Sequence, residues 1–467
     1  MSLTLLLLVA YSLLMAAIGL WIGRHVRATR DFFVAGRSLG PALIFATFLA
    51  GNIGAGSTVG AAGLGFRDGL SAWWWNASAG IGCLVLAFTV GPRMWRESVT
   101  HGDLTVGDFL ERRYGRDLRL AVAILIWVGT LSILAAQILG MSTVFQVVAG
   151  TSKLAGCVLG AALVSVYFVA GGLLSSAYVN LVQLAVKLVG FALVAPMAMA
   201  LAGGWDAIGA DPARMDLLAG GSPQSGWRLL FFLGPAFVVS PGLIQKAYGA
   251  RDERAVTTGI ALNGVVLMAF AALPTIIGMS AYALHPGINK DLAFATMASE
   301  LTPVLGALAL AAVFSAEASA ADAVLFMLAT SGSRDLYRRV RPDATDRDLL
   351  RAARWAAIAG AVLGLGLAMM HRSVIDALAT FYAVMVVTLF VPLIAGLYAR
   401  HTSRRQGLAS LVGVPVLAMV HFSTGGAGYG ALTPTVAGVL VSALAFFATG
   451  AKSLSPPSTP STPRRYD

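Results

Sequence analysis

Thirteen apolar stretches dominate the sequence, and each is long enough to cross a lipid bilayer as a helix. A bilayer core about 30 Å thick needs roughly 20 apolar residues per helix. With 57% hydrophobic and 12% charged residues and a mean hydropathy of +0.78, the chain has too little charge to cover a water-soluble domain. The sequence therefore predicts an all-α polytopic membrane protein of about 13 transmembrane helices. The stretches lie near residues 2–23, 41–66, 70–92, 118–149, 154–173, 177–202, 228–249, 256–284, 301–333, 352–370, 374–398, 407–423 and 431–450.

The positions of the positive charges predict how these helices are oriented. The chain has 33 Lys and Arg against 22 Asp and Glu, a net charge of +11. Of the 33 cations, 26 lie in alternate loops on one side and 6 in the loops on the other. Because cytoplasmic loops are enriched in Lys and Arg, we expect a multi-pass inner (plasma) membrane protein with its N-terminus outside and its C-terminus cytoplasmic. The basic excess is then a topology signal, and nucleic acid is not an expected partner.

Two of the stretches contain helix-breaking residues. The second contains GNIGAGS at 51–57, and the seventh contains Gly234-Pro235 and Ser240-Pro241-Gly242. Paired broken helices in inverted repeats point to a transport site near the bilayer midplane, whereas ordinary kinks are the alternative interpretation. The second break comes five stretches after the first, so stretches 2–6 and 7–11 would form two five-helix halves with opposite orientations. The expected regions are a first helix and loop (1–40), a first repeat (41–202), an extracellular loop (203–227), a second repeat (228–398), two peripheral helices (399–450) and a disordered cytoplasmic tail (451–467).

Short motifs follow one another at loops and helix ends. They are DFFVAGRSLG at 31–40, GGL at 171–173 running to Gln183, QKAYGARD at 245–252, and SAAD at 319–322 followed by RDLY at 334–337. In this order they resemble the sodium:solute symporter family, which includes sodium/glucose and sodium/proline transporters. The resemblance covers roughly residues 2–400. It implies a leucine-transporter-type inverted-repeat fold, with one helix before the ten-helix core and two after it.

The resemblance also implies a sodium site between the broken second helix and the ninth helix. Carried over residue by residue, its ligands are the backbone carbonyls of Ala50, Ile53 and Ala316 and the side-chain oxygen of Ser319. The chemistry suits a hard cation, because unwound backbone offers free carbonyls and sodium, like calcium, prefers oxygen ligands. We therefore expect sodium as the possible metal and no other cofactor.

Two positions depart from the family pattern. Ala320 stands where the family usually has a second hydroxyl, and Asn180 stands where it usually has an aspartate. Lys187 follows Asn180 by seven residues on the same helix face, roughly 10 Å deeper in the membrane. A lysine in mid-helix costs about 2.5–3.5 kcal/mol on insertion scales. It therefore needs a partner or a purpose.

Three interpretations of Lys187 stay open. Its ammonium group could replace the sodium ion, as a basic side chain does in sodium-independent members of the wider superfold. It could then also carry a coupling proton, because burial disfavours the charged form of an amine. Alternatively, Lys187 snorkels its amine to the cytoplasmic interface, or it forms a structural ion pair with Glu317 on the ninth helix.

The solute is expected to bind where the two broken helices face each other. Glu317 slightly favours a cationic or hydrogen-bond-rich solute, whereas Ser240 and Gly242 lie where sugar-transporting relatives carry larger side chains. Trp73, Trp74 and Trp75 could belong to the cavity or to an interfacial belt. The candidates for substrate binding are Asn52, Gly56, Ser57, Asn76, Ser240, Gly242 and Glu317. Gln137 and Gln183 could line the path or bond across helices, and for His421 a packing role is expected.

Other functional classes find little support in the sequence. Paired carboxylates, His/Cys clusters and nucleophile motifs are missing from interface positions, so we do not expect an enzyme, and Cys83 and Cys157 lie inside apolar stretches. The predicted function is a secondary active transporter, a solute:cation symporter that imports a small polar organic solute by alternating access. A sodium-independent or proton-coupled transporter is the alternative, as is a transporter-like sensor that signals through a partner. The sequence does not predict the oligomeric state.

Overall fold

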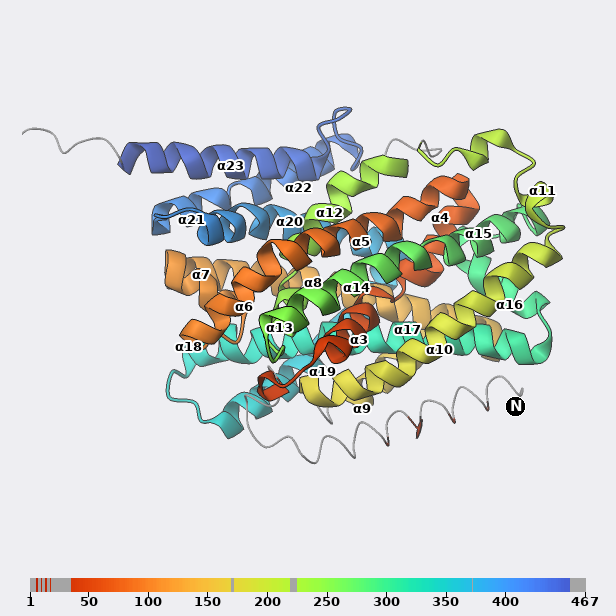
Figure 1. The fold of residues 1–467 in the computed structure, drawn as a ribbon, viewed down its shortest axis with the longest axis horizontal. Helices are drawn as coiled ribbons and strands as arrows, with labels where there is room; N and C mark the ends of the chain where they lie inside the picture. The colour runs from red at the N-terminus through yellow and green to blue at the C-terminus, as the bar shows by residue number, and fades with distance from the viewer. Residues whose placement is uncertain are drawn as a thin grey trace, which may run out of the picture.

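The computed structural model describes residues 35–168, 172–218, 225–371 and 373–453, with five isolated positions before residue 35. Within these ranges every regular element is a helix, and the only β pairing is two isolated bridges, Leu39–Ala250 and Tyr429–Leu432. The long helices run side by side along the bundle (Figure 1). The predicted all-α class is confirmed, while the tail from 454 and, apart from those five positions, the stretch 2–23 lie outside the described residues.

Seven of the described helices are long and apolar enough to span a membrane, or up to nine if each of two bent helix pairs is one span. The predicted number of thirteen is not established, because α9 and α23 contain only shorter apolar helices, Lys153–Ala162 and Pro434–Gly450. In chain order the α-helices are α3 (Pro41–Asn52), α4 (Ala61–Asp68), α5 (Trp73–Phe88), α6 (Val90–His101), α7 (Val106–Tyr114), α8 (Arg116–Ala149), α9 (Lys153–Phe168), α10 (Gly172–Leu201), α11 (Trp205–Ile208), α12 (Leu229–Val239), α13 (Pro241–Ala247), α14 (Glu253–Phe270), α15 (Ala272–Leu284), α16 (Ala293–Glu300), α17 (Pro303–Thr330), α18 (Arg338–Val340), α19 (Asp346–Met370), α20 (Val374–Tyr398), α21 (Arg404–Ser410), α22 (Gly413–Thr424) and α23 (Pro434–Ser453).

Both predicted breaks are present. Helix α3 ends at Asn52, and the chain resumes as a π-helical turn, η2 (Gly56–Gly60), which leads into α4; the bend between Pro41–Asn52 and Gly56–Phe88 is 64°. The second pair bends by 44° at Ser240, where Pro241 begins α13. Proline is favoured at a first helical position because its missing N–H has no helical partner there. Pro235, by contrast, lies inside α12.

The first break lies in the interior of the bundle. Helix α3 packs against α10, α14 and α17, and α5 packs against α12 and α14. Small residues allow helices to approach closely in membranes, and α4 crosses α15 in this way. A Cβ on Gly278 would lie 1.9 Å from the Ala62 carbonyl oxygen, and one on Gly65 would lie 2.5 Å from that of Thr275. This packing holds the second half of the broken helix in place.

Candidate functional site

The break after α3 leaves backbone groups without helical partners, and side chains satisfy several of them. The Ala55 N–H donates to Gln137 Oε1 on α8 at 2.8 Å. The Asn52 carbonyl accepts from Ser57 Oγ at 2.6 Å, and the Gly54 carbonyl accepts from the Ser57 N–H at 2.9 Å. Buried backbone groups are costly unless they are paired. Gln137 and Ser57 therefore hold the unwound conformation.

Replacing Gln137 by leucine should lower the melting temperature of the purified protein. The Ala55 N–H would lose its acceptor, and leaving a buried donor unpaired costs about 1–3 kcal/mol. The matched control is Gln146→Leu on the same helix, because Gln146 is half-buried and bonds only to Ser142 Oγ in the described residues. Equal melting temperatures for the two variants would contradict the role given to Gln137.

The side chain of Lys187 reaches this break from α10 and is fully buried. Its Nζ lies 2.7 Å from Ser319 Oγ, 3.3 Å from the Ile53 carbonyl oxygen and 3.4 Å from that of Ala50. Ser319 Oγ in turn lies 3.0 Å from the carbonyl oxygens of Ala50 and Ala316. The C-terminal end of a helix carries partial negative charge and favours cations. The ammonium group thus contacts three of the four oxygens that the resemblance implied for sodium.

A second lysine meets the same half-helix. Lys246, one of the 26 cations counted above in the loops of one side, is buried in the structure, and its Nζ donates to the Thr47 carbonyl oxygen at 2.8 Å. A Cβ on Gly51 would lie 2.5 Å from this Nζ, so Gly51 leaves the room that the lysine needs. The sequence alone does not decide where the amine of a lysine near the end of a span lies. Its long aliphatic side chain can lead the amine either to water or into the helix bundle. Two ammonium groups therefore lie along the carbonyls of α3.

The residues that depart from the family pattern are buried near this break or on the same helix as Lys187. Ala320 packs against the unwound segment, since a Cβ on Gly54 would lie 2.4 Å from the Ala320 Cβ. Asn180 is fully buried on α10. Thus neither position adds an acidic or hydroxyl oxygen to the Lys187 contacts.

Glu317 contacts the helical turn that follows the break. It is fully buried, and its Oε1 accepts a hydrogen bond from Thr58 Oγ1 at 3.0 Å. Its Oε2 has no hydrogen-bond partner in the described part of the chain. A Cβ on Gly140 would lie 2.6 Å from this oxygen, so α8 packs closely against it. Glu317 and Lys187 both belong to the described part of the chain, and no carboxylate oxygen of Glu317 lies within 4.0 Å of Lys187 Nζ, so the two residues form no ion pair.

A cavity of about 350 Å³, its open part included, lies beside the break. Of the predicted substrate residues, Asn52, Gly56, Ser57 and Asn76 line it. Ser240, Gly242 and Glu317 do not. Gly242 faces another helix, because a Cβ there would lie 2.0 Å from Met327 Sδ. The break in the seventh span therefore packs against α17 instead of lining this cavity.

The other half of the cavity wall is aromatic and apolar. Trp75 lines it, whereas Trp74 donates its indole N–H to the Leu217 carbonyl at 2.9 Å and packs against Trp73 away from the cavity. Phe237 and Tyr382 complete this wall.

Sequence reasoning missed Phe237, Tyr382 and Leu378, which lie on α12 and α20 without any motif. Gln137 does line the cavity, whereas Gln183 is buried elsewhere and His421 is exposed beside the ring of Phe422.

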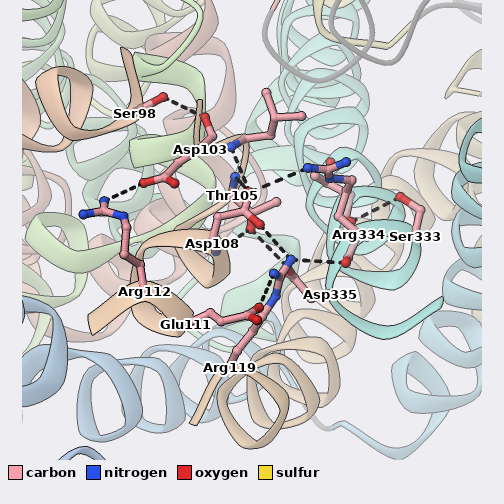
Figure 2. A network of polar contacts seen from close by, with 12 residues as sticks. Ser98, Asp103, Thr105, Asp108, Glu111, Arg112, Arg119, Ser333, Arg334 and Asp335 are labelled. Carbon is pink, nitrogen blue, oxygen red and sulfur yellow. Dashed lines mark hydrogen bonds and ion pairs between the residues drawn. The ribbon is translucent and has the colours of Figure 1, made fainter. Parts of the chain in front are cut away.

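Ion pairs close one end of the bundle, which we call the Arg-rich end (left in Figure 1). Arg119 on α8 contacts Asp335 at 2.7 Å, Asp108 at 2.9 Å and Glu111 at 2.6 Å, and Thr105 Oγ1 donates to Asp335 at 3.0 Å. These five residues, the Arg119 network, converge from α7 and its N-cap residue Thr105, from α8 and from the turn η7 (Ser331–Tyr337) (Figure 2). The network therefore ties segments of the first repeat to the end of the ninth helix.

A second group of polar contacts also holds segments together at the Arg-rich end. Arg112 donates to Asp103 at 2.9 Å, and Arg37 donates to Ser98 Oγ at 2.9 Å and to the Tyr248 carbonyl at 3.3 Å. Burial raises the pKa of the Asp103 carboxyl above its ordinary value, and the Arg112 guanidinium opposes that rise. Behind the Arg119 network lies a cavity of about 460 Å³, its open part included, lined by Gly107, Gln245, Met327 and Ser331 among others.

The described residues contain no group of three or more His, Cys, Asp or Glu that could hold a metal ion. Cys83 and Cys157 are buried and free.

Comparisons with known proteins agree with this architecture. The chain is 23% identical over 403 residues to a sodium/glucose cotransporter of Vibrio parahaemolyticus, covering 76% of this chain and 72% of that protein. It is 24% identical over 383 residues to the high-affinity proline transporter PutP of Bacillus subtilis, covering 79% and 81%. The solved structure of a Na⁺-coupled sialic acid symporter in a substrate-bound outward-open state matches with a TM-score of 0.79 at 17% identity, covering 98% and 99%. Mhp1, a nucleobase-cation-symport-1 family transporter, matches with a TM-score of 0.58 at 15% identity, covering 92% and 96%.

The fold is therefore the leucine-transporter type that the motifs implied. The model of the sodium:solute symporter family matches residues 32–413, which include both breaks, Lys187 and the Arg119 network. The chain belongs to the sodium:solute symporter family.

Proposed function

We propose that this protein is a secondary active transporter that moves a small polar organic solute by alternating access, and that Lys187 takes the place of the sodium ion. One observation carries the proposal: Lys187 Nζ lies 2.7–3.4 Å from Ser319 Oγ and the carbonyl oxygens of Ile53 and Ala50. These oxygens belong to the set that the family resemblance assigns to sodium. A sodium ion does not fit among them while the ammonium group occupies this position.

The cavity beside the break is the proposed solute site. It lies next to unwound backbone in the second span, which is where transporters of this architecture bind their solutes. The Arg119 network then closes the Arg-rich end, and the solute leaves through the second cavity when the network opens. The excess of 26 cations on one side over 6 on the other supports a cytoplasmic orientation of that end in the plasma membrane.

The proposal is tested by uptake into proteoliposomes with sodium replaced by choline, at two pH values. The solute is the one that most stabilises the purified protein in a thermal-shift screen. We expect equal uptake in sodium and in choline. Strict sodium dependence would overturn the role of Lys187, and absence of flux for every stabilising solute would favour a sensor. Accumulation that follows an imposed pH gradient would identify the proton as the coupling ion.

A further inference from the structure

The solute cavity contains no charged side chain among the described residues that line it. Its polar residues are Ser57, Asn52, Asn76 and Gln137, together with Trp75 and Tyr382, which carry an indole N–H and a hydroxyl, and the rest of the lining is glycine, aliphatic or aromatic. Lys187 and Glu317 lie nearby but outside the lining. A charged solute would leave water without meeting an opposite charge, which is unfavourable at a buried site. The lining therefore favours an uncharged solute.

The two helix ends at the break are also already matched by charges of the protein. Lys187 meets the carbonyls at the C-terminal end of α3, where the helix dipole favours a cation. Glu317 meets Thr58, in the first turn of the helix that resumes at Gly56, where the dipole favours an anion. Half-helix ends bind ionic groups of solutes and coupling ions in other transporters. Here the protein supplies both ionic groups itself.

Both donors and acceptors in the cavity wall are left without a hydrogen bond to the described part of the protein. Asn52 Nδ2 donates to Asn263 Oδ1 at 3.2 Å and Asn76 Nδ2 donates to the Ser57 carbonyl at 3.0 Å, so each amide leaves its oxygen as an acceptor for a solute. Trp75 and Tyr382 line the same cavity, and neither the indole N–H of Trp75 nor the hydroxyl of Tyr382 has a hydrogen-bond partner in the described residues. A solute there meets two acceptors and two donors.

The aromatic side of the cavity favours a flat molecule. The ring of Tyr382 lies 6.4 Å from that of Trp75 and 5.6 Å from that of Phe237, with interplanar angles of 64° and 39°. Faces of this kind bind planar groups by stacking and edge contacts. Amide edges opposite an aromatic wall suit a molecule with polar edges and an apolar face.

From these observations we propose that the solute is uncharged and planar, with donor and acceptor groups at its edges, as in amides and ureides. The inference rests on the proposed transport function, because it concerns the solute of that same cavity. It excludes solutes that need a carboxylate or an ammonium group for recognition. The slight preference for a cationic solute that Glu317 suggested in the sequence is thereby replaced.

Matched pairs of neutral and charged molecules test the proposal on the purified full-length protein. The pairs are urea and guanidinium, nicotinamide and nicotinate, and uracil and orotate, each added at the same millimolar concentration in a thermal-shift experiment and confirmed by calorimetry. We expect at least one neutral member to bind and its charged counterpart to bind at least about tenfold more weakly, a difference of 1.4 kcal/mol. Equal or tighter binding of the charged members would overturn the proposal. So would the absence of binding by all three neutral members.

A charge introduced into the cavity provides the second test. Asn76→Asp places a carboxylate on the lining, so this variant should lose preference for urea over guanidinium. Asn289→Asp is the matched control, because Asn289 lies in an exposed turn before η6 (Lys290–Leu292) and should keep the wild-type preference. An unchanged preference in a folded Asn76→Asp variant would contradict the assignment of this cavity.

These binding experiments need no ion gradient and no flux, so their outcome is separable from that of the uptake assay. Neutral solutes that bind but never cross the membrane would overturn the transport function and leave the solute class standing. Flux of charged solutes alone would overturn the class and leave transport standing.

Discussion

Uptake in the absence of sodium should be lost when Lys187 is replaced by alanine. The variant removes the cation from the carbonyl oxygens of Ala50 and Ile53 and from Ser319 Oγ, which the ammonium contacts at 2.7–3.4 Å. Leaving buried polar groups unpaired costs about 1–3 kcal/mol each, so the unwound segment beside the solute cavity should lose its shape. Both sodium-free uptake and the melting temperature should therefore fall.

The matched control is Lys153→Ala. Lys153 is a half-buried lysine at the start of α9 and donates to the His371 carbonyl at 3.2 Å, away from the break. Its loss should leave sodium-free uptake near that of the wild type. Full sodium-free uptake by Lys187→Ala would show that the ammonium is not needed at this position.

Sodium itself provides a sharper form of the same experiment. In Lys187→Ala the oxygens of Ala50, Ile53 and Ser319 are free to accept a small cation, and oxygen ligands suit sodium. Adding Asn180→Asp and Ala320→Ser supplies the carboxylate and the hydroxyl that the family pattern has at those positions. Sodium should stabilise this triple variant more than choline does, and it should not do so for the wild type. Equal effects of the two cations on the triple variant would contradict the comparison between ammonium and sodium.

Loss of Arg119 should open the Arg-rich end of the bundle. The guanidinium lies between Asp335, Asp108 and Glu111, at 2.6–2.9 Å from each. Removing one member of a buried ion-pair network costs about 3–5 kcal/mol, because the charges left behind are uncompensated. In Arg119→Ala, Asp335 and Asp108 would lose their shortest ion pairs, and of the described ion pairs of these two residues only the longer contact between Arg334 and Asp108, at 4.0 Å, would remain. Conformations that separate η7 from α7 and expose these carboxylates to water should therefore become more populated.

The opening is measured by the labelling rate of a cysteine placed at Ser331, which lines the second cavity. The native cysteines Cys83 and Cys157 are buried, and protein without the added cysteine gives their background. We expect labelling of Ser331→Cys to be at least about tenfold faster in the Arg119→Ala background, which corresponds to 1.4 kcal/mol.

Arg116→Ala is the control on the same helix. Arg116 also pairs with Glu111, at 3.1 Å, but its side chain is 81% exposed, and exposed pairs contribute little. The same labelling rate in both arginine variants would mean that the Arg119 network does not hold this end closed.

Lys187 shows how much of the site could be predicted from sequence. A lysine inside an apolar stretch is conspicuous, and helical periodicity identifies its face and depth. Its hydrogen bonds could not be predicted in the same way, because Ala50 lies 137 positions earlier in the chain and Ser319 lies 132 positions later. Whether the amine reaches these oxygens, the interface or Glu317 depends on how α3, α10 and α17 pack.

The residues that line the solute cavity also differ in whether the sequence could identify them. Asn52, Ser57 and Asn76 are polar residues at or near the first break, so sequence reasoning could name them. Phe237 and Tyr382 are aromatic residues in apolar helices and resemble any other core residue in the sequence. Ser240 and Gly242 mark a real break, yet neither lines the solute cavity, and Gly242 packs against Met327 on α17.

The sequence by itself determined the all-α membrane class, the two helix breaks and the family. Each of these depends on properties of a short window, such as apolar length, glycine and proline content, or the order of motifs. Only the tertiary structure decided which buried charge meets which backbone group, and which face of each broken helix lines a cavity. Those contacts join segments far apart in the chain, and the packing of whole helices places their atoms within hydrogen-bonding distance.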